Sequence, residues 1–295
     1  MIRGDIDMIL RIKRIHAFIF IISILLICTI IGISTQAISI SKSVPQNCTP
    51  LPVIMYHQIS TESGRTGKFV ITARQLENDF KYIKEAGYEA ITMKDLLSHI
   101  EKGTKLPKKP IMITFDDGYE TFYTIVLPLL QKYDLKAIVS VIGSATDKFS
   151  QKEDHNTSYS HLNWDEIAEL VDSKYTEVQN HSYDLHTKAH GRKGVARKPG
   201  ESFEDYKKVI MNDLGKLQDA MIENTGYAPT AFAFPFGTCP SCCISVLKEL
   251  GIKAAFNCVA KVNYIDRKNT NWLYDINRFN RPSGLTSEDF FSKIL

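Results

Sequence analysis

The sequence lacks a strong excess of charge of either sign. Its 36 Lys and Arg residues are nearly balanced by 33 Asp and Glu, which leaves a net charge of +3. This balance does not indicate nucleic acid or another polyanion as a partner. No internal repeat is found, and nothing in the sequence identifies a protein partner. The length of 295 residues and the apolar content of 44% fit one large α/β domain or two small ones.

Cysteine is scarce, and its pattern is a poor match to a zinc-binding framework. The stretch CPSCC at 239–243 contains a CxxC, but there is no second CxxC and no nearby histidine. With Cys258, these thiols could form a disulfide in an oxidising compartment, and a CxxC can also bind metal or act in redox chemistry. We expect a structural or incidental role for them. Cys28 and Cys48 lie outside the predicted domain.

The N-terminus carries the one long apolar run. Basic residues between 11 and 14 precede an uncharged, mostly apolar segment from 15 to about 34, and about 20 residues suffice to cross a bilayer. Because the basic flank stays in the cytoplasm, the rest of the chain is expected outside it. A cleaved signal peptide is the alternative, since 35–37 resemble a cleavage site. We favour an uncleaved anchor over 1–34; cleavage would make the protein secreted.

After a polar linker over 35–50, residues 51–295 alternate predicted strands and helices, which is typical of a mostly parallel sheet or barrel. The predicted strands are 52–57, 88–92, 111–116, 137–142, 176–181, 230–234, 252–257 and, as a last one, 273–279.

Three helices have clear start signals. Thr72 with Gln75 predicts a capping box, and Asn163 with Glu166 predicts a second cap. A long helix is predicted from Ser202 to near Gly226.

Polar residues follow several of these strands at their C-terminal ends, the face that carries the active site in barrels. His57 ends the first strand, Asp116 and Asp117 the third, and His181 the fifth, with His186 five residues further on. Two adjacent carboxylates repel each other, so a cation or a shared proton is expected beside them.

The spacing of the two histidines indicates where they can meet. Five residues apart, they share neither a helix face nor one side of a strand. They converge only if the chain turns between them, as it does after a strand. Two imidazoles and a carboxylate form an open site that suits Zn²⁺; other divalent metals also accept this set. The alternatives are that His181 and His186 are surface loop histidines and that Asp117 only caps a helix.

Two further stretches have weaker signals. In FAFPFG at 232–237, Pro235 and Gly237 force a bend that can aim a backbone N–H into a cleft, although a plain turn is the default. Residues 188–200 carry five Lys or Arg and no acid. We expect them to form a solvated mobile loop; contact with an anionic cell-surface polymer is the alternative.

Taken in order, TFDDG, HSYDLH and FPFG resemble the motifs of polysaccharide deacetylases of the NodB-homology type. VIMYHQI at 53–59 and the stretch 75–96 are similar to the subgroup of poly-N-acetylglucosamine deacetylases. The resemblance covers about residues 51–280 and implies an α/β fold, a distorted (β/α)7 barrel. It also implies metal-dependent removal of N-acetyl, sometimes O-acetyl, groups from sugars.

Carried over by position, the resemblance implies a role for each motif residue. Asp116 would be the general base, and Asp117, His181 and His186 would hold a divalent metal, Zn²⁺ first, with Co²⁺, Ni²⁺ or Fe²⁺ as alternatives. The backbone N–H of Phe236 would help to hold the oxyanion.

The sequence departs from the family pattern in three places. The histidine pair has one residue more between its members than in many relatives. Many relatives place an Arg that orients the base where this chain has Ala233; Arg278 is a candidate substitute, and a structural ion pair is its alternative role. No histidine follows His190, although a late histidine is usually the general acid. His57 is a candidate for the cleft, or else a buried strand histidine.

The leading interpretation is an extracytoplasmic hydrolase that removes acetyl groups from an N-acetylglucosamine-containing polymer and is anchored in the membrane. Two alternatives remain: a carbohydrate-binding or inactive relative, and an O-acetyl esterase acting on wall polymer.

Overall fold

The structure is a computed structural model that describes residues 48–152 and 154–295. The predicted membrane anchor or signal segment over 1–34, most of the predicted linker and Cys28 lie outside the described residues. Residues Thr49–Leu295 form one compact unit. Within the two described ranges, no helix has the length and apolar character needed to span a membrane.

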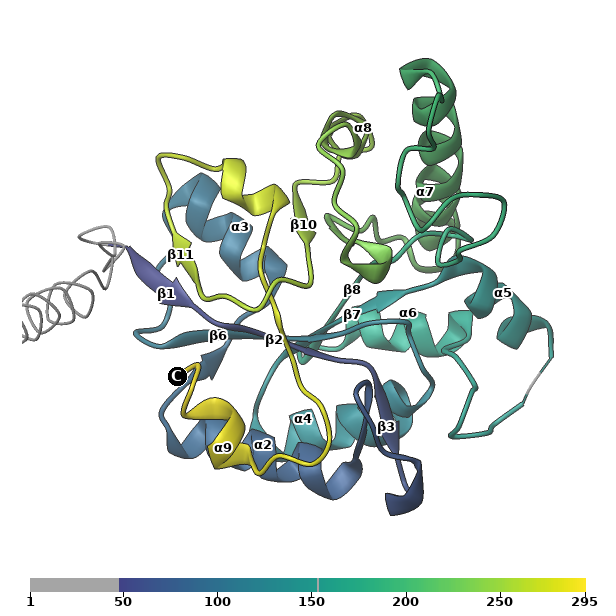
Figure 1. The fold of residues 1–295 in the computed structure, drawn as a ribbon. Coiled ribbons are helices and arrows are strands. Elements are labelled where there is room, and N and C mark those ends of the chain that lie inside the picture. Colours follow the sequence, from purple (N-terminus) through teal and green to yellow (C-terminus); the bar gives the residue numbers. More distant parts are fainter. Residues whose placement is uncertain (1–47, 153) are drawn as a thin grey trace, which may run out of the picture. The chain divides into compact units, whose positions relative to one another are not determined.

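A curled parallel sheet is the centre of this unit (Figure 1). Its hydrogen-bonded order is β10-β9-β8-β7-β6-β2-β12, and β5 also pairs with β6. The strands are β2 (Val53–Tyr56), β5 (Glu89–Ala90), β6 (Pro110–Phe115), β7 (Ala137–Val141), β8 (Thr176–Asn180), β9 (Ala231–Ala233), β10 (Ala254–Phe256) and β12 (Phe279–Asn280). The predicted α/β architecture with a parallel sheet is confirmed, as a curled half-barrel flanked by helices.

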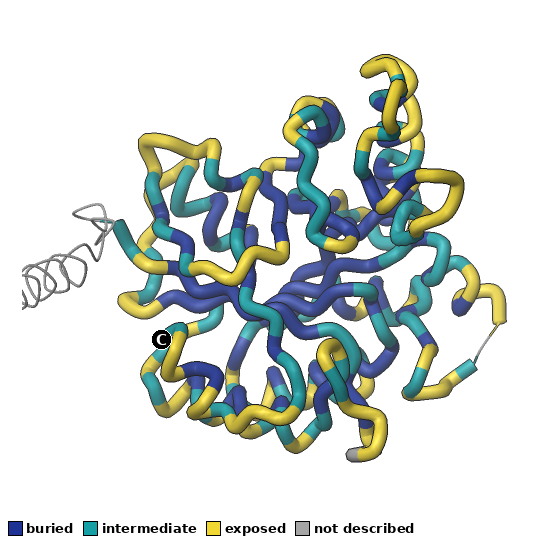
Figure 2. The backbone as a smooth tube through the Cα atoms, viewed as in Figure 1, coloured by how far each residue is buried: buried dark blue, intermediate teal, exposed yellow. Residues whose placement is uncertain are grey.

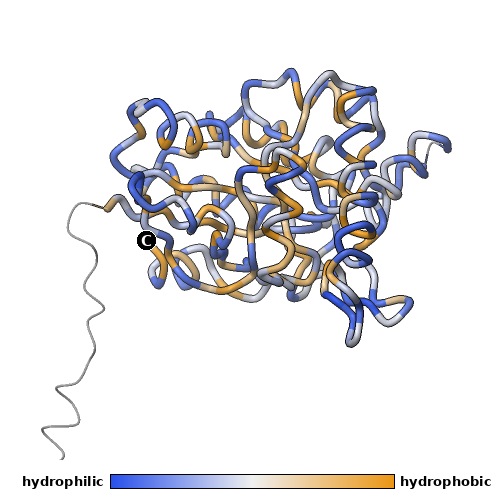
Figure 3. Tube along the Cα trace, turned by 90° about the horizontal axis from the view of Figure 1, so that it is seen from above, coloured by the Kyte–Doolittle hydropathy of each residue, from blue (hydrophilic) through white to orange (hydrophobic). Residues whose placement is uncertain are grey.

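Burial on both faces explains why the central strands read as continuous apolar runs. Every residue of β2, β6, β7 and β8 is buried, as expected for a parallel sheet covered by helices on both sides. In Figure 1, α2, α4 and α9 lie on one side of the central strands, and α3 and α7 on the other. The buried strands and exposed loops are evident in Figure 2, and the apolar interior in Figure 3.

The helices occupy the connections between strands. They are α2 (Ala73–Glu85), α3 (Met93–Lys102), α4 (Leu127–Tyr133), α5 (Gly143–Gln151), α6 (Trp164–Asp172), α7 (Phe203–Thr225), α8 (Cys243–Glu249) and α9 (Ser287–Phe291). A π-helical turn, η2 (Phe122–Val126), precedes α4, and 3-10 turns lie at η1 (Ser63–Arg65), η3 (Pro235–Gly237) and η4 (Asn271–Tyr274).

The predicted helix starts hold, with one difference. The Asn163–Glu166 capping box is present at α6, and Ser202 caps α7, which ends at Gly226 with φ 70°. At α2, Thr72 accepts a hydrogen bond from the Gln75 N–H. The Gln75 side chain, however, donates to the Leu285 carbonyl, so the box is only half formed.

Four short strands were not predicted. They are β1 (Thr49–Leu51), which pairs with β11 (Asn263–Ile265), and β3 (Gln58–Ser60), which pairs with β4 (Val70–Thr72). β1 includes Thr49 and Pro50, which the sequence analysis placed in the linker. The predicted strand at 273–279 is wrong over most of its length, because 271–274 form the turn η4 and only Phe279–Asn280 pair as a strand.

The segment from 276 to 281 crosses the gap between the two edges of the sheet. The Ile276 N–H donates to the Ala255 carbonyl of β10, and the Ile276 carbonyl accepts from the Asn257 N–H just after β10. The Arg281 N–H donates to the Met55 carbonyl of β2. Arg281 also forms a fully buried ion pair with Asp79 of α2, at 2.8 Å. Because the segment is fixed at both ends, Arg278 between them is held in a buried position near the C-terminal ends of the strands.

Candidate active site

A cavity of about 380 Å³ opens at the C-terminal ends of the strands. It is lined by all the predicted site residues except Arg278, which lies buried behind Asp116. The lining residues are Met55, His57, Gln58, Lys68, Phe69, Val70, Asp116, Asp117, Tyr119, His181, His186, Phe234, Phe236, Cys258 and Asn280.

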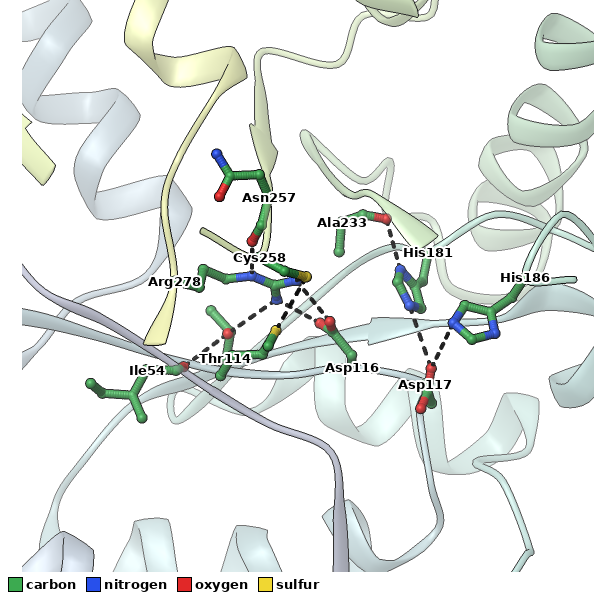
Figure 4. Close-up of polar contacts among 11 residues, drawn as sticks. Ile54, Thr114, Asp116, Asp117, His181, His186, Ala233, Asn257, Cys258 and Arg278 are labelled. Carbon is green, nitrogen blue, oxygen red and sulfur yellow. Dashed lines mark hydrogen bonds and ion pairs between the residues drawn. The ribbon is translucent and has the colours of Figure 1, made fainter. Parts of the chain in front are cut away.

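The two adjacent carboxylates avoid mutual repulsion by facing different partners. Asp116 points to Arg278, whereas Asp117 points to His181 and His186 (Figure 4). The chain can separate them because Asp117 adopts φ 73° and Gly118 φ 69°. A Cβ at Gly118 would come within 3.0 Å of Val141, so this turn requires glycine there.

Asp117, His181 and His186 meet around a common centre. The Asp117 Oδ1 atom lies 3.4 Å from His181 Nε2 and 3.5 Å from His186 Nε2, and all three ligand atoms lie within 4.8 Å of one another. Metal–ligand bonds of about 2.0–2.2 Å in a tetrahedral arrangement separate the ligand atoms by about 3.3–3.6 Å. The two separations from Asp117 Oδ1 therefore suit a small divalent cation.

The polar atoms of this group also fit a cation. Asp117 Oδ1 is buried and makes no hydrogen bond, which is costly unless a positive charge faces it. His181, only 2% exposed, has its Nδ1 at 2.7 Å from the Ala233 carbonyl. Because that contact requires a proton on Nδ1, the Nε2 lone pair is left to bind a metal.

Burial and charged neighbours together set the pKa shifts of these three residues. Burial works to lower the pKa of His181, but the carboxylates of Asp116 and Asp117 raise it above its usual value. Burial works to raise the pKa of Asp117, yet His181 keeps it below the ordinary value. For His186, burial and the neighbouring His181 lower the pKa.

Arg278 binds both carboxylate oxygens of Asp116. Its Nη1 and Nη2 atoms donate to Asp116 Oδ1 and Oδ2, each at 2.7 Å, and its Nε donates to the Asn257 carbonyl at 2.9 Å. Both side chains are buried, with exposures of 0% and 3%. Burial works to raise the pKa of Asp116, but Arg278 holds it far below its usual range. The carboxylate is thus ionised and fixed in orientation.

Three non-glycine residues with positive φ lie at the site. Besides Asp117, these are Ser182 (φ 79°), which follows His181, and Phe236 (φ 60°). Such conformations cost free energy in non-glycine residues and gather at functional sites. In the η3 turn, the N–H groups of Gly237 and Thr238 donate hydrogen bonds to backbone carbonyls. The Phe236 N–H does not take part in these hydrogen bonds.

His57 also lines the cavity. Its ring lies 4.7 Å from that of Phe69, and its Nδ1 atom is buried without a hydrogen-bond partner. Burial lowers the pKa of His57 below its usual value, against the opposing effect of Asp116 and Asp117. The structure therefore places His57 in the cavity, and its Nδ1 atom has no hydrogen-bond partner.

Sequence reasoning missed some of the site. The Ala233 carbonyl is a backbone group and carries no sequence signal. Cys258 lies in the cavity, with its Sγ 3.8 Å from Arg278 Nη2 and 3.7 Å from Met55 Sδ. All five described cysteines are free thiols, so no disulfide joins them.

One protein family matches this chain. The polysaccharide deacetylase family model matches residues 103–255, about half of the chain, and the protein belongs to that family. The match includes Asp116, Asp117, both histidines and Phe236 but ends before Arg278.

Curated relatives are named poly-β-1,6-N-acetyl-D-glucosamine N-deacetylase. The one from Escherichia coli K12 is 24% identical over 69% of this chain and 33% of its own length, so this chain spans about a third of that relative. The one from Staphylococcus aureus MSSA476 is 27% identical over 80% of this chain and 74% of its own length.

Solved structures share the fold. IcaB from Ammonifex degensii has a TM-score of 0.65 at 24% identity, covering 80% of this chain and 93% of its own. The Streptococcus pyogenes deacetylase PplD, in complex with acetate, has a TM-score of 0.68 at 18% identity, covering 84% and 99%.

Proposed function

We propose that this protein hydrolyses N-acetyl groups on an N-acetylglucosamine-containing polymer outside the cytoplasm and releases acetate. The observation that carries the proposal is one cavity with two differently used carboxylates: Asp116, fixed by Arg278, and Asp117, grouped with two histidines. The names of the curated relatives point to the same acetamide substrate. Membrane anchoring through residues 1–34 is part of the proposal and rests on the sequence alone.

Asp117, His181 and His186 are proposed to hold a divalent cation, with Zn²⁺ favoured by two imidazoles and one carboxylate. When bound, such a cation would make a nearby water molecule more acidic and would polarise the acetyl carbonyl. Asp116 takes the proton from the attacking water. The two hydrogen bonds from Arg278 occupy one lone pair on each carboxylate oxygen of Asp116. The second lone pair on each oxygen remains available to accept the proton.

Two further groups are proposed to stabilise the negative charge on the carbonyl oxygen and to protonate the leaving amine. The Phe236 N–H is proposed to donate to the carbonyl oxygen as negative charge grows there. His57 is proposed to donate a proton to the nitrogen as the carbon–nitrogen bond breaks, in place of the late histidine that the chain lacks. The Nδ1 atom of His57, which has no hydrogen-bond partner, is the ring nitrogen available for this transfer.

The test is an acetate-release assay on three substrates: β-1,6-linked N-acetylglucosamine oligomers, chitin-type oligomers and O-acetylated xylan fragments. We expect release from an N-acetylated substrate, loss of release after chelation, and recovery with Zn²⁺. Release from the O-acetylated substrate alone would replace the proposal with an esterase. Glycan binding without acetate release in excess Zn²⁺, Co²⁺ or Ni²⁺ would indicate an inactive relative.

Substitution of Arg278 by Lys is expected to shift the pH dependence of kcat/KM. A lysine donates to one carboxylate oxygen at a time, so the pKa of Asp116 rises and the carboxylate is protonated at higher pH. The acid limb of the profile should then move to higher pH, so the loss of rate is expected on the acid side, while the carboxylate stays ionised near neutrality. An unchanged acid limb would show that Arg278 has only a structural role.

Substitution of His57 by Gln is expected to lower kcat by about 10²–10³-fold, the contribution of one positioned proton donor. Metal content should stay unchanged, since His57 is not in the Asp117 group. The measurement is kcat together with bound zinc per protein. A rate within about threefold of the parent would mean that Asp116 itself returns the proton.

A further inference from the structure

Most residues of the basic stretch 188–200 are exposed, as expected for a solvated loop, but Arg192, Gly194 and Val195 are buried. Val195 is fully buried, and its carbonyl accepts a hydrogen bond from the Tyr206 hydroxyl at 3.0 Å. At Gly194 (φ 55°), a Cβ would lie 3.0 Å from the Pro235 carbonyl oxygen and 3.4 Å from the Phe236 ring. The loop thus contacts the turn that carries the proposed oxyanion donor.

The charges of this stretch serve two different purposes. Arg192 is buried, pairs with Glu201 and donates to the Ala196 carbonyl at 2.6 Å, so its charge is used in shaping the loop. Lys188 and Lys193 instead lie beside the Phe236 ring, with their Nζ atoms 5.5 and 5.8 Å from its centre.

A third lysine lies with the other aromatic ring of the cavity. Lys68 and Phe69 both line it, and the Lys68 Nζ atom is 5.1 Å from the Phe69 ring centre. Phe69 and Phe236 are 45% and 37% exposed, so each offers a ring face to a bound sugar. Lysines therefore accompany both exposed rings.

No acidic group balances these lysines inside the cavity. Among its described lining residues, the acidic ones are Asp116 and Asp117. Asp116 is neutralised by Arg278, and Asp117 faces His181 and His186. A sugar that enters beside the target acetamide therefore experiences a net positive field.

From this arrangement, and resting on the proposed deacetylase activity, we propose that Lys68, Lys188 and Lys193 select the charge of the sugar next to the target. Deacetylation is expected to be fastest when the neighbouring sugar is anionic and slower when that sugar is neutral. It is expected to be slowest when the neighbouring sugar carries a free, protonated amine. Since the reaction itself produces such amines, each turnover makes the adjoining unit a poorer substrate. Free amines would then be spaced along the product rather than clustered.

The expected effect is moderate. Two unit charges about 8 Å apart change a rate by about 2-fold at the dielectric constant of water and by about 30-fold at the value near 20 found at protein surfaces. We expect about a 5-fold change in kcat/KM for each step from anionic to neutral to cationic neighbour. Because Lys188 and Lys193 are exposed to solvent, the differences should shrink as salt rises.

The experiment uses three β-1,6-linked trisaccharides with the same central N-acetylglucosamine. The two outer nitrogens carry N-succinyl groups (anionic), N-propionyl groups (neutral) or free amines (cationic at about pH 6.5). Acetate can come only from the central unit. The full chain, loaded with Zn²⁺, is assayed for kcat/KM on each substrate at low and high salt.

The variant is the double substitution K188Q/K193Q, and its control is K81Q/K248Q on α2 and α8. We expect the ratio of anionic to cationic rates to fall at least about 5-fold in the first variant and to stay unchanged in the control. Equal rates on all three substrates, or an unchanged ratio in K188Q/K193Q, would overturn the inference while leaving the deacetylase activity in place. No acetate from any substrate would overturn both.

Discussion

Substitution of Asp116 by Asn is expected to reduce acetate release by about 10³-fold, within the range for loss of a general base. Asparagine keeps the shape of the side chain but cannot take up the proton of the attacking water. Zinc content should remain that of the parent, because Asp117, His181 and His186 are intact. The measurement is kcat together with bound zinc, and activity within about 10-fold of the parent would reject Asp116 as the base.

This variant needs a stability control, because Asn leaves the buried Arg278 without its counter-ion. Removal of one partner from a buried ion pair costs about 3–5 kcal/mol, and the midpoint of thermal unfolding should fall accordingly. The double variant D116N/R278M removes both charges and should regain much of the free energy of unfolding while remaining inactive. If the double variant recovered activity along with stability, the low rate of D116N would reflect misfolding and not a missing base.

The second large effect is expected for the metal group. Substitution of His181 or His186 by Ala, or of Asp117 by Asn, should weaken Zn²⁺ binding by at least about 100-fold, since even groups that only support a ligand contribute 10–100-fold. Acetate release without added metal should fall to background. Isothermal titration with Zn²⁺ after removal of metal gives the affinity directly.

His99→Gln is the matched control, because His99 is on α3 and its Nδ1 contacts the Thr104 carbonyl. It should bind Zn²⁺ as the parent does. Should H181A and H186A also keep the parent's affinity, these histidines would form a hydrogen-bonded cluster with Asp117 and the metal would bind elsewhere or not at all.

The sequence predicted the parts of the fold whose signals are local. Buried strands such as Pro110–Phe115 appear as apolar runs bounded by breakers, and α6 begins at the predicted cap Asn163. The strand predicted at 273–279 failed because a short apolar run does not distinguish a strand from a turn. Only Ile276 and the pair Phe279–Asn280 find neighbouring strands there.

For the site, the sequence predicted which residues gather and offered Arg278 as a candidate partner of Asp116, but it did not predict the path of the chain that brings them together. The order of strand ends was enough to place Asp117, His181 and His186 together. That Asp116 turns away toward Arg278, 162 positions later, depends on how the segment 276–281 crosses the sheet. The packing of Val195 and the ion pair of the buried Arg192 with Glu201 likewise depend on contacts that a charge-rich stretch of sequence does not reveal.

The most direct test of the proposed metal centre is anomalous diffraction from crystals of the protein grown with Zn²⁺, collected at the zinc absorption edge. The account predicts one strong peak at bonding distance, about 2.0–2.2 Å, from Asp117 Oδ1, His181 Nε2 and His186 Nε2. A fully occupied zinc peak elsewhere, with none between these three atoms, would contradict it.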